Sequence, residues 1–206
     1  RHSNDRGSAV RIEHVITAGW SRASISEAHH SGGSNGDAGD GSLGAFALLG
    51  KHCPTGLALI LARYNKDPGQ KQQALREVIA TGRTLAPAYL AKLTRRADGK
   101  AITSVALLAL DAYCRTADTP GAACQCCKGR GVTLARATNS ERLCERCRGT
   151  GLRPITGARV RRALTLCLGD VSRHDWESRW YPFYLALVAW CHQMEAEATN
   201  RLRRLG

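Results

Sequence analysis

The sequence predicts a mainly α-helical protein, a bundle of helices into which one small cysteine-rich module is inserted. Two observations lead to this fold class. Apolar residues recur at helical spacing on both sides of the centre of the chain, and the centre holds two copies of one cysteine and glycine pattern. With 206 residues and a hydrophobic content of 43%, the chain is long enough for one domain, or two small ones, with a buried core.

The balance of charge favours a polyanionic partner. Thirty Lys and Arg residues stand against seventeen Asp and Glu residues, which leaves a formal net charge of +13. Such a balance favours nucleic acid over acidic protein or lipid as the partner. Most of the cations are arginine, whose planar guanidinium suits phosphates and guanine edges. A GC-rich genome would also supply arginine freely, but it does not explain the net charge.

Residues 1–42 are predicted to form a disordered N-terminal arm. Gly, Ser, Asn and Asp dominate the stretch from His30 to Ser42, and this composition cannot bury enough apolar surface to offset chain entropy. The first residues are polar and charged, unlike a secretory signal peptide, so we expect a reducing cytoplasm. The longest apolar runs, Val105 to Leu110 and Phe183 to Trp190, are too short to cross a bilayer.

Residues 43–117 are predicted to form the helical bundle. Four groups of apolar residues repeat at helical spacing, around Leu57, Leu75, Tyr89 and Val105. The expected breaks between the helices are Pro54, Asp67 to Gly69, Gly82, Pro87 and Asp98 to Gly99, with Pro87 in the first turn of its helix. This segment shows no catalytic pattern, and lone carboxylates such as Glu77 are expected to be solvated or ion-paired. We therefore expect no enzyme.

The cysteine-rich module consists of two matching repeats. Residues 124–131 and 144–151 both read C-x-x-C-x-G-x-G, and sixteen residues separate the second cysteine of the first repeat from the first cysteine of the second. Two thiolates three residues apart on a tight turn point at one position, and two such pairs supply the four soft ligands of tetrahedral Zn²⁺. The glycines allow backbone N–H groups to approach the sulfur atoms. The predicted ligands of one structural Zn²⁺ are Cys124, Cys127, Cys144 and Cys147.

Other pairings of these cysteines remain open at this stage. A secreted protein could instead form two disulfides, and Cys126 offers a second register within the first repeat. We prefer Cys124 and Cys127 as ligands because only they reproduce the spacing of the second repeat. Cys126 is then a spare thiol.

The zinc-finger module is predicted to span residues 118–152. Val132, Leu134 and Leu143 alternate with polar residues between the repeats, a pattern that predicts a short hairpin. A unit of this size cannot fold on its apolar core alone, so we expect metal binding to supply most of its stability. Its arginines could face either nucleic acid or an acidic protein surface.

Residues 153–206 are predicted to form a helix-turn-helix and a C-terminal helix that packs on the bundle. Val160, Ala163, Leu164 and Cys167 lie on one helical face, arginines surround the other, and residues 168–170 break the helix. Ser172 can cap a second helix, which would enter the major groove by its N-terminal residues. Any helical hairpin shares this outline. The candidate DNA-binding residues are Arg159, Arg161, Arg162, Arg173, His174, Glu177 and Arg179.

Pro182 is expected to end or kink this second helix. A final amphipathic helix then runs from Phe183 to Arg204. Trp176 and Trp180 lie four residues apart on the buried side of the second helix, so we expect them in the core rather than stacked on bases.

Several motifs together resemble the Q family of late-gene antitermination proteins of lambda-like bacteriophages. The similarity covers roughly Gly44 to Leu202 and is close from Tyr113 onward. The matching segments are Gly44 to Phe46, Gly50 to His52, Ala112 to Ala117, Thr119 to Ala122, both cysteine repeats, Arg161 to Leu166 and Trp176 to His192.

This resemblance implies a DNA-binding transcription factor. Proteins of the Q family recognise a site that overlaps the phage late promoter and engage paused bacterial RNA polymerase through the primary sigma factor and the flap of the beta subunit. They then travel with polymerase past terminators in the host bacterial cytoplasm, at the nucleoid. The zinc cysteines of the family map onto Cys124, Cys127, Cys144 and Cys147, and its helix-turn-helix maps onto about Ile155 to Trp180.

Three other functions share some of these features. DnaJ-type chaperones use the same cysteine repeat to bind polypeptides, but they carry more repeats and a His-Pro-Asp turn, neither of which occurs here. A thiol–disulfide enzyme would need one exposed, metal-free C-x-x-C pair. A zinc-dependent DNA-binding repressor would share every DNA-binding part, and only a transcription assay would separate it from an antitermination factor.

Overall fold

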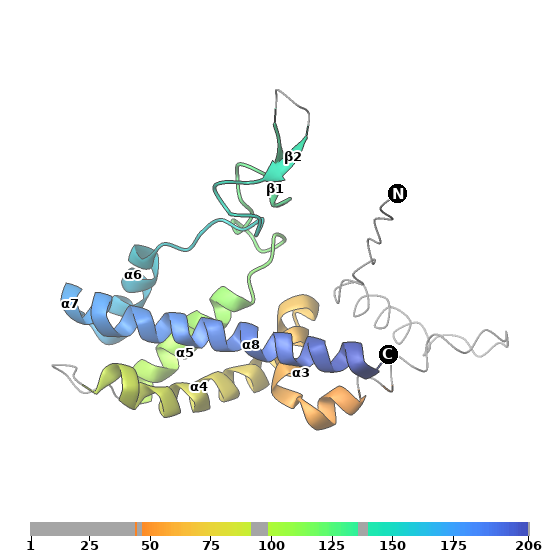
Figure 1. Ribbon diagram of the computed structural model, residues 1–206. Helices are drawn as coiled ribbons and strands as arrows, with labels where there is room; N and C mark the ends of the chain where they lie inside the picture. The colour runs from red at the N-terminus through yellow and green to blue at the C-terminus, as the bar shows by residue number, and fades with distance from the viewer. Residues whose placement is uncertain (1–43, 45–46, 92–98, 136–139, 206) are drawn as a thin grey trace.

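The helices in the described part of the chain form one body, from which the cysteine-rich module projects (Figure 1). The computed structural model describes residues 44, 47–91, 99–135 and 140–205. The arm predicted at residues 1–42 lies outside the described residues. Within them the chain is mainly α-helical with one cluster of four cysteines, so this part of the predicted fold class is confirmed.

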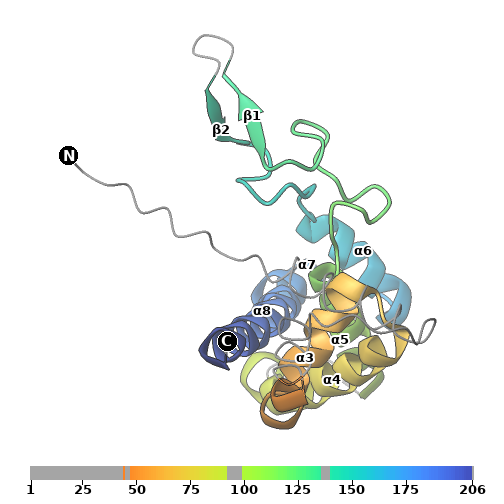
Figure 2. The ribbon, with the colours of Figure 1, turned by 90° about the vertical axis from the view of Figure 1, so that its right-hand side faces the viewer.

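Helices of very different length build the body within the described residues. The helical elements in chain order are α3 (Pro54–Ile60), the π-helical turn η1 (Leu61–Asn65), α4 (Pro68–Leu90), α5 (Gly99–Tyr113), α6 (Gly157–Leu168), α7 (Arg173–Asp175), the π-helical turn η2 (Trp176–Trp180) and α8 (Tyr181–Leu205). Figure 2 shows α8 beside α3, α4 and α5, all of which it contacts. None of the described helices is both long enough and apolar enough to span a membrane.

Side-chain caps begin several helices where the sequence places them. Pro54 occupies the first turn of α3, and the Asp67 carboxylate accepts a hydrogen bond of 3.0 Å from the backbone N–H of Gln70 at the start of α4. Thr156 caps α6 and Ser172 caps α7 in the same way. The expected breaks at Pro54 and at Asp67 to Gly69 and the cap at Ser172 are therefore confirmed.

Two of the predicted breaks are wrong. Gly82 and Pro87 both lie inside α4, which continues to Leu90. Gly82 is buried, and a Cβ atom there would stand 3.0 Å from Cγ2 of Ile102, so its missing side chain lets α5 approach closely. The packing of α4 on α5 and α8 outweighs the local cost of a glycine and a proline in a helix.

The main core lies between α4, α5, α8 and the α6–η2 region. Its fully buried side chains include Val78, Leu110, Leu164, Phe183 and Leu187. Trp176 and Trp180 are buried in the same core, as predicted. A second, small cluster joins Leu49, Ile60 and Ala198 where α3 packs on the C-terminal half of α8.

The helix that begins at Arg173 does not end at Pro182. Helical structure runs through α7, η2 and α8 to Leu205, so of the two expected outcomes at Pro182, an end or a kink, the end is wrong. In η2 the backbone N–H of Tyr181 donates to the carbonyl oxygen of Trp176, five residues earlier. Proline lacks the N–H that an α-helix needs, and the wider π-helical turn directly before Pro182 accommodates that loss.

The module between α5 and α6 contains two short strands, β1 (Val132–Leu134) and β2 (Glu141–Leu143). They pair antiparallel, with Val132 opposite Leu143 and Leu134 opposite Glu141. An isolated bridge pairs Ala123 with Leu152 at the base of the module. The chain therefore enters and leaves the module along adjacent segments (Figures 1 and 2).

Candidate metal centre and nucleic-acid interface

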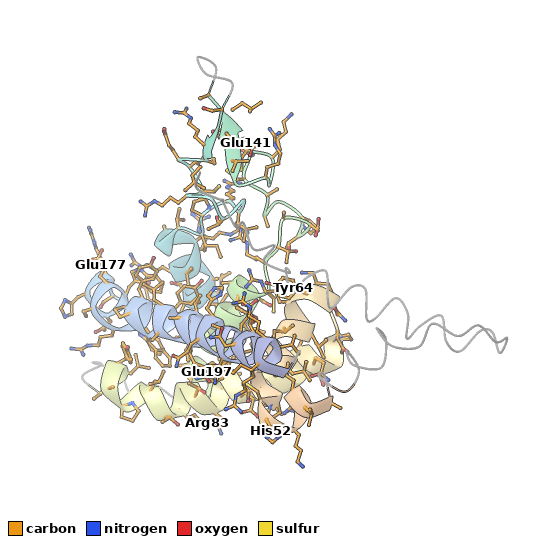
Figure 3. The ribbon with its side chains drawn as sticks, turned by 45° about the vertical axis from the view of Figure 1, so that its right-hand side comes forward. His52, Tyr64, Arg83, Glu141, Glu177 and Glu197 are labelled. Carbon is orange, nitrogen blue, oxygen red and sulfur yellow. The ribbon has the colours of Figure 1, made fainter. Side chains whose placement is uncertain are left out.

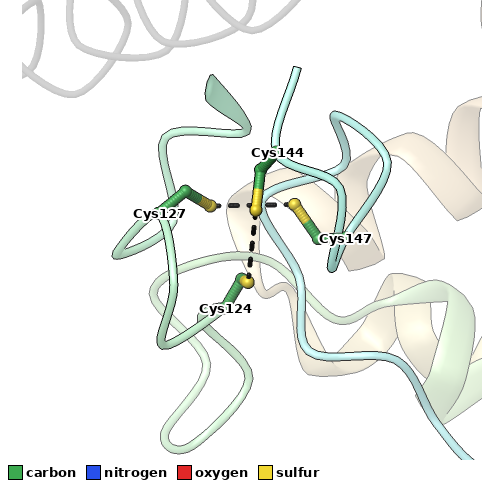
Figure 4. Close-up of side chains that lie close together, drawn as sticks. All are labelled: Cys124, Cys127, Cys144 and Cys147. Atoms are coloured by element: carbon green, nitrogen blue, oxygen red, sulfur yellow. Dashed lines mark hydrogen bonds between the residues drawn. The ribbon is translucent and has the colours of Figure 1, made fainter. Parts of the chain in front are cut away.

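Four cysteine sulfur atoms meet at one buried point of the module. The Sγ atoms of Cys124, Cys127, Cys144 and Cys147 all lie within 4.8 Å of one another. The Sγ–Sγ distance is 4.0 Å between Cys124 and Cys144 and 3.7 Å between Cys127 and Cys147 (Figure 4). All four residues are buried, so this cluster can hold a metal ion.

The geometry of the cluster fits a tetrahedral thiolate site. Zn–S bonds of about 2.3 Å in a tetrahedron place the sulfur atoms about 3.8 Å apart, close to the two distances above. A disulfide would bring two sulfur atoms to about 2.05 Å. All cysteines in the described residues are free thiols, and both C-x-x-C pairs are buried, which does not suit a thiol–disulfide enzyme.

The two repeats hold each other by matching backbone hydrogen bonds. The N–H of Cys124 donates to the carbonyl oxygen of Gly151, and the N–H of Cys144 donates to that of Gly131, each at 2.8 Å. The first cysteine of each repeat is thus bonded to the last glycine of the other. The cluster has an approximate twofold arrangement for this reason.

Glycine is required at the last position of each repeat. Gly131 and Gly151 have φ values of +78° and +71°, in the left-handed region. A Cβ atom on Gly131 would collide with the carbonyl oxygen of Gly149, and one on Gly151 would collide with that of Gly129. The N–H of Gly131 lies 3.3 Å from Sγ of Cys127, so the predicted approach of backbone N–H groups to sulfur is confirmed there.

The surroundings of the cluster act differently on two of its thiols. The backbone N–H of Cys147 is the main cause that lowers the pKa of Cys144 to about 6. Burial raises the pKa of Cys127 to about 11. A divalent cation at the centre would favour the thiolate form of every ligand.

The remaining cysteines lie apart from the cluster. Cys126 is exposed and is not among the four grouped sulfur atoms, as its role of spare thiol requires. Cys191 is buried in the helical core, where burial raises its pKa to about 12. Such a thiol behaves as a small apolar side chain.

The predicted apolar face of α6 is only partly correct. Val160 and Leu164 are buried, but Cys167 is exposed. Leu166 is 84% exposed as well. One narrow stripe of α6, which also includes the partly buried Leu168, therefore packs on the body.

The predicted DNA-binding residues lie on α6, α7 and η2, which sit together at one end of the body (Figure 1). Arg159, Arg162, Arg173, His174 and Glu177 are exposed, whereas Arg161 and Arg179 are partly buried.

Three of these seven side chains already have partners in the protein. Nη2 of Arg161 donates to the carbonyl oxygen of Val171 at 3.2 Å and so ties α6 to the turn before α7. Nε of Arg173 donates to Glu177 at 2.8 Å, and both of these side chains are exposed. Glu177 lies at the end of the body in Figure 3. The assignment of all seven residues to DNA stays a prediction.

The sequence does not indicate the contact between two arginines beside the module. Nη2 of Arg115, just after α5, donates to the carbonyl oxygen of Arg153 at 2.9 Å. The N–H of Arg153 donates in turn to the carbonyl oxygen of Ala122 at 2.7 Å. Because these residues are 38 apart in sequence, only their positions directly outside the predicted module could have indicated that they meet.

Comparison with known proteins places the chain in a family. Residues 88–205, more than half of the chain, match the family described as conserved hypothetical protein CHP02642. The chain belongs to this family. The match covers the cysteine module, α6 and all of α8, and so includes the four clustered cysteines and the candidate DNA-binding residues.

Curated relatives confirm the resemblance that the motifs indicate. The chain is 29% identical over 168 residues to antitermination protein Q of Salmonella phage P22 and 28% identical to that of Escherichia phage lambda; each alignment covers 78% of this chain and 81% of the relative. It is also 36% identical over 96 residues to antitermination protein Q of bacteriophage PS34, across 44% of this chain and 46% of the relative.

Proposed function

We propose that this protein is a phage transcription antitermination factor and not an enzyme. It binds DNA at a late promoter, loads onto paused bacterial RNA polymerase and makes the polymerase read through terminators. The observation that carries this proposal is the similarity to antitermination proteins Q over 81% of their length. Its site of action is then the host bacterial cytoplasm, at the nucleoid.

In this proposal the four clustered cysteines bind one structural Zn²⁺. Their buried sulfur atoms and the interlocked backbone of the two repeats support this assignment. A bound Zn²⁺ would stabilise the thiolates and the fold of the module without taking part in a reaction. The module then fixes the segments that enter and leave it, and with them the start of α6.

DNA binding rests on the exposed cations of α6 and α7 in this proposal. Arg159 and Arg162 supply salt-sensitive contacts to phosphates, and the first residues of the α7–η2 helix supply base contacts. The ion pair of Arg173 with Glu177 does not hinder this role. Both side chains are exposed, at 80% and 58%, and such a pair contributes little, so Arg173 can exchange it for a base edge.

Contact with polymerase is assigned to the primary sigma factor and the beta flap on the basis of the Q-family resemblance. The β1–β2 end of the module lies beyond α6, away from the helical body and α7 (Figures 1 and 2). This separation supports two simultaneous contacts, one with DNA and one with protein.

A transcription assay tests the proposal. Purified bacterial RNA polymerase transcribes a template that carries a phage late promoter followed by a terminator, with and without the protein. We expect a larger fraction of transcripts to pass the terminator. A control template with an unrelated promoter should show no change. A fall in initiation without any gain in readthrough would instead identify a repressor.

Base reading is tested separately on the same DNA. Replacement of Arg173 by Ala should relax the preference among promoter variants, with roughly 1–3 kcal/mol lost for a bidentate base contact. Arg83→Ala, at an exposed position of α4, is the matched control and should leave the preference unchanged. An unaltered preference in the Arg173 variant would remove this residue from the reading set.

A further inference from the structure

Three arginines from separate segments meet where the cysteine module joins the helical body. Arg115 follows α5, Arg153 follows the second cysteine repeat, and Arg159 lies in the first turn of α6. The hydrogen bond from the Arg115 guanidinium to the Arg153 carbonyl holds the first two together at 2.9 Å. Arg115 and Arg159 both line a cavity of about 610 Å³ between α5, α6 and the Thr119–Ala122 turn.

This arrangement concentrates positive charge that the protein leaves unneutralised. None of the three arginines forms an ion pair within the described part of the chain. Burial lowers the pKa of Arg115, and the neighbouring charges of Arg159 and Arg153 lower it further. Two carboxylates also line the cavity, but Asp111 is paired with Lys71 at 2.7 Å and Asp118 is exposed and pairs with none of the three.

We propose that Arg115, Arg153 and Arg159 form a phosphate-binding cluster for the backbone of duplex DNA at this joint. The inference rests on the proposed DNA binding and adds to it a site that involves both ends of the cysteine module. Arginine pairs with phosphate through two parallel N–H···O bonds, and a DNA backbone supplies several phosphates at regular spacing. Several mutually repelling guanidinium groups can be neutralised at once by such a polyanion.

The continuity of this cluster with α6 favours DNA over an acidic protein. Arg159 belongs both to the cluster and to the exposed cationic surface of α6 that also carries Arg162. A phosphate track that begins at Arg162 would continue across the joint to Arg115. The cysteine module would then also position part of the DNA-binding surface, because Arg115 and Arg153 lie at its two ends.

The test measures how salt weakens binding to a labelled duplex of arbitrary sequence. Three forms of the full chain are compared by fluorescence anisotropy over a range of potassium chloride concentrations. They are the wild type, R115A/R153A/R159A and the control R76A/R83A/R201A, which removes three exposed arginines of α4 and α8. The charge-preserving variant R115K/R153K/R159K and thermal unfolding of each form separate lost charge from lost folding.

We expect the logarithmic salt slope to fall by about 2 to 3 in the cluster variant, since each phosphate contact contributes about 0.9. The control and the lysine variant should keep a slope close to that of the wild type. If the wild type binds but a folded cluster variant keeps its full slope, the cluster assignment is overturned. The assignment is also overturned if the cluster variant loses binding to RNA polymerase but keeps binding to DNA. The three arginines would then contact a protein surface. If the wild type binds no duplex, the proposed DNA binding itself is overturned.

Discussion

The backbone N–H of Cys144 donates a 2.8 Å hydrogen bond to the carbonyl oxygen of Gly131, across the two cysteine repeats. Cys124 and Gly151 repeat this contact on the other side of the cluster. Each repeat thus depends on the other for backbone pairing, and each supplies two of the four clustered thiols that could hold a metal ion. This relationship makes the module a single cooperative unit and leads to the predictions below.

Metal binding should depend on Cys144 and not on Cys126. Cys144→Ser removes one of four buried ligands, whereas Cys126 is exposed and outside the cluster. We expect one Zn²⁺ per chain in the wild type and in Cys126→Ser, and a weakly bound or absent metal in Cys144→Ser. Elemental analysis after dialysis against a mild chelator measures this. Equal metal content in the two variants would contradict the ligand assignment.

Zinc affinity should also depend on the absence of a side chain at Gly131. Gly131→Ala places a Cβ atom against the carbonyl of Gly149 and adds a left-handed strain of roughly 1–2 kcal/mol. We expect a total cost of at least about 2 kcal/mol, or more than tenfold in zinc affinity, because metal binding and module folding are coupled.

Gly121→Ala is the matched control for this substitution. Gly121 has a φ of +69°, but no atom lies within 4 Å of the Cβ position. It should therefore show only the left-handed strain. Chelator competition measures both variants, and equal losses of affinity would show that the contact between Gly131 and Gly149 does not constrain the module.

A partly buried ion pair should make the helical body sensitive to acid. Nη1 of Arg63 donates to Glu195 at 2.8 Å, the hydroxyl of Tyr64 donates at 2.7 Å, and the two charged side chains are 18% and 14% exposed. Burial alone would raise the pKa of Glu195, but His192, Arg63 and Tyr64 together hold it below its ordinary value. Stability from this pair is therefore present above the ordinary carboxyl pKa of about 4.3 and is lost as pH falls through the lower folded value.

Glu195→Gln tests this pair. We expect a loss of about 3 kcal/mol at neutral pH, the low end for breaking a buried pair because some exposure remains. The deficit relative to the wild type should shrink as the pH falls below about 4. Asp111→Asn, in the exposed pair with Lys71, should cost less than about 1 kcal/mol. Urea unfolding across this pH range measures all three proteins, and a deficit independent of pH would contradict the role of Glu195.

The two adjacent arginines of α6 should behave differently. Arg162 is exposed, so Arg162→Ala should lower the salt slope of DNA binding by about 0.9 and leave stability unchanged. Arg161 donates to the carbonyl of Val171, so Arg161→Ala should cost roughly 1 kcal/mol of stability. Salt titration and urea unfolding of both variants measure these effects. A slope unchanged in the Arg162 variant would remove it from the phosphate contacts.

The cluster of four cysteines was predictable because its information is local. The ligands lie three residues apart within each repeat, and the glycines at the same offsets fix the turn that brings Cys144 toward Gly131. Helix ends were predictable where a cap is local, as at Asp67 and Ser172.

Features that depend on packing between distant elements were not predictable in the same way. Gly82 and Pro87 stay helical because α5 and α8 pack on α4, and Pro182 stays helical because a π-helical turn precedes it. Arg115 and Arg153 meet only because the module returns the chain to its starting point. The helix propensities of single residues do not predict contacts between elements that are distant in sequence.

Terminator readthrough by the two cysteine variants tests the central claim most directly, namely that a metal-held module supports an antitermination factor. Cys126→Ser and Cys144→Ser differ by one atom each from the wild type, and only Cys144 belongs to the cluster. With purified RNA polymerase on a phage late-promoter template, we expect Cys126→Ser to match the wild type and Cys144→Ser to lose readthrough. Full readthrough by a zinc-free Cys144→Ser protein, or none by the zinc-loaded wild type, would contradict the account.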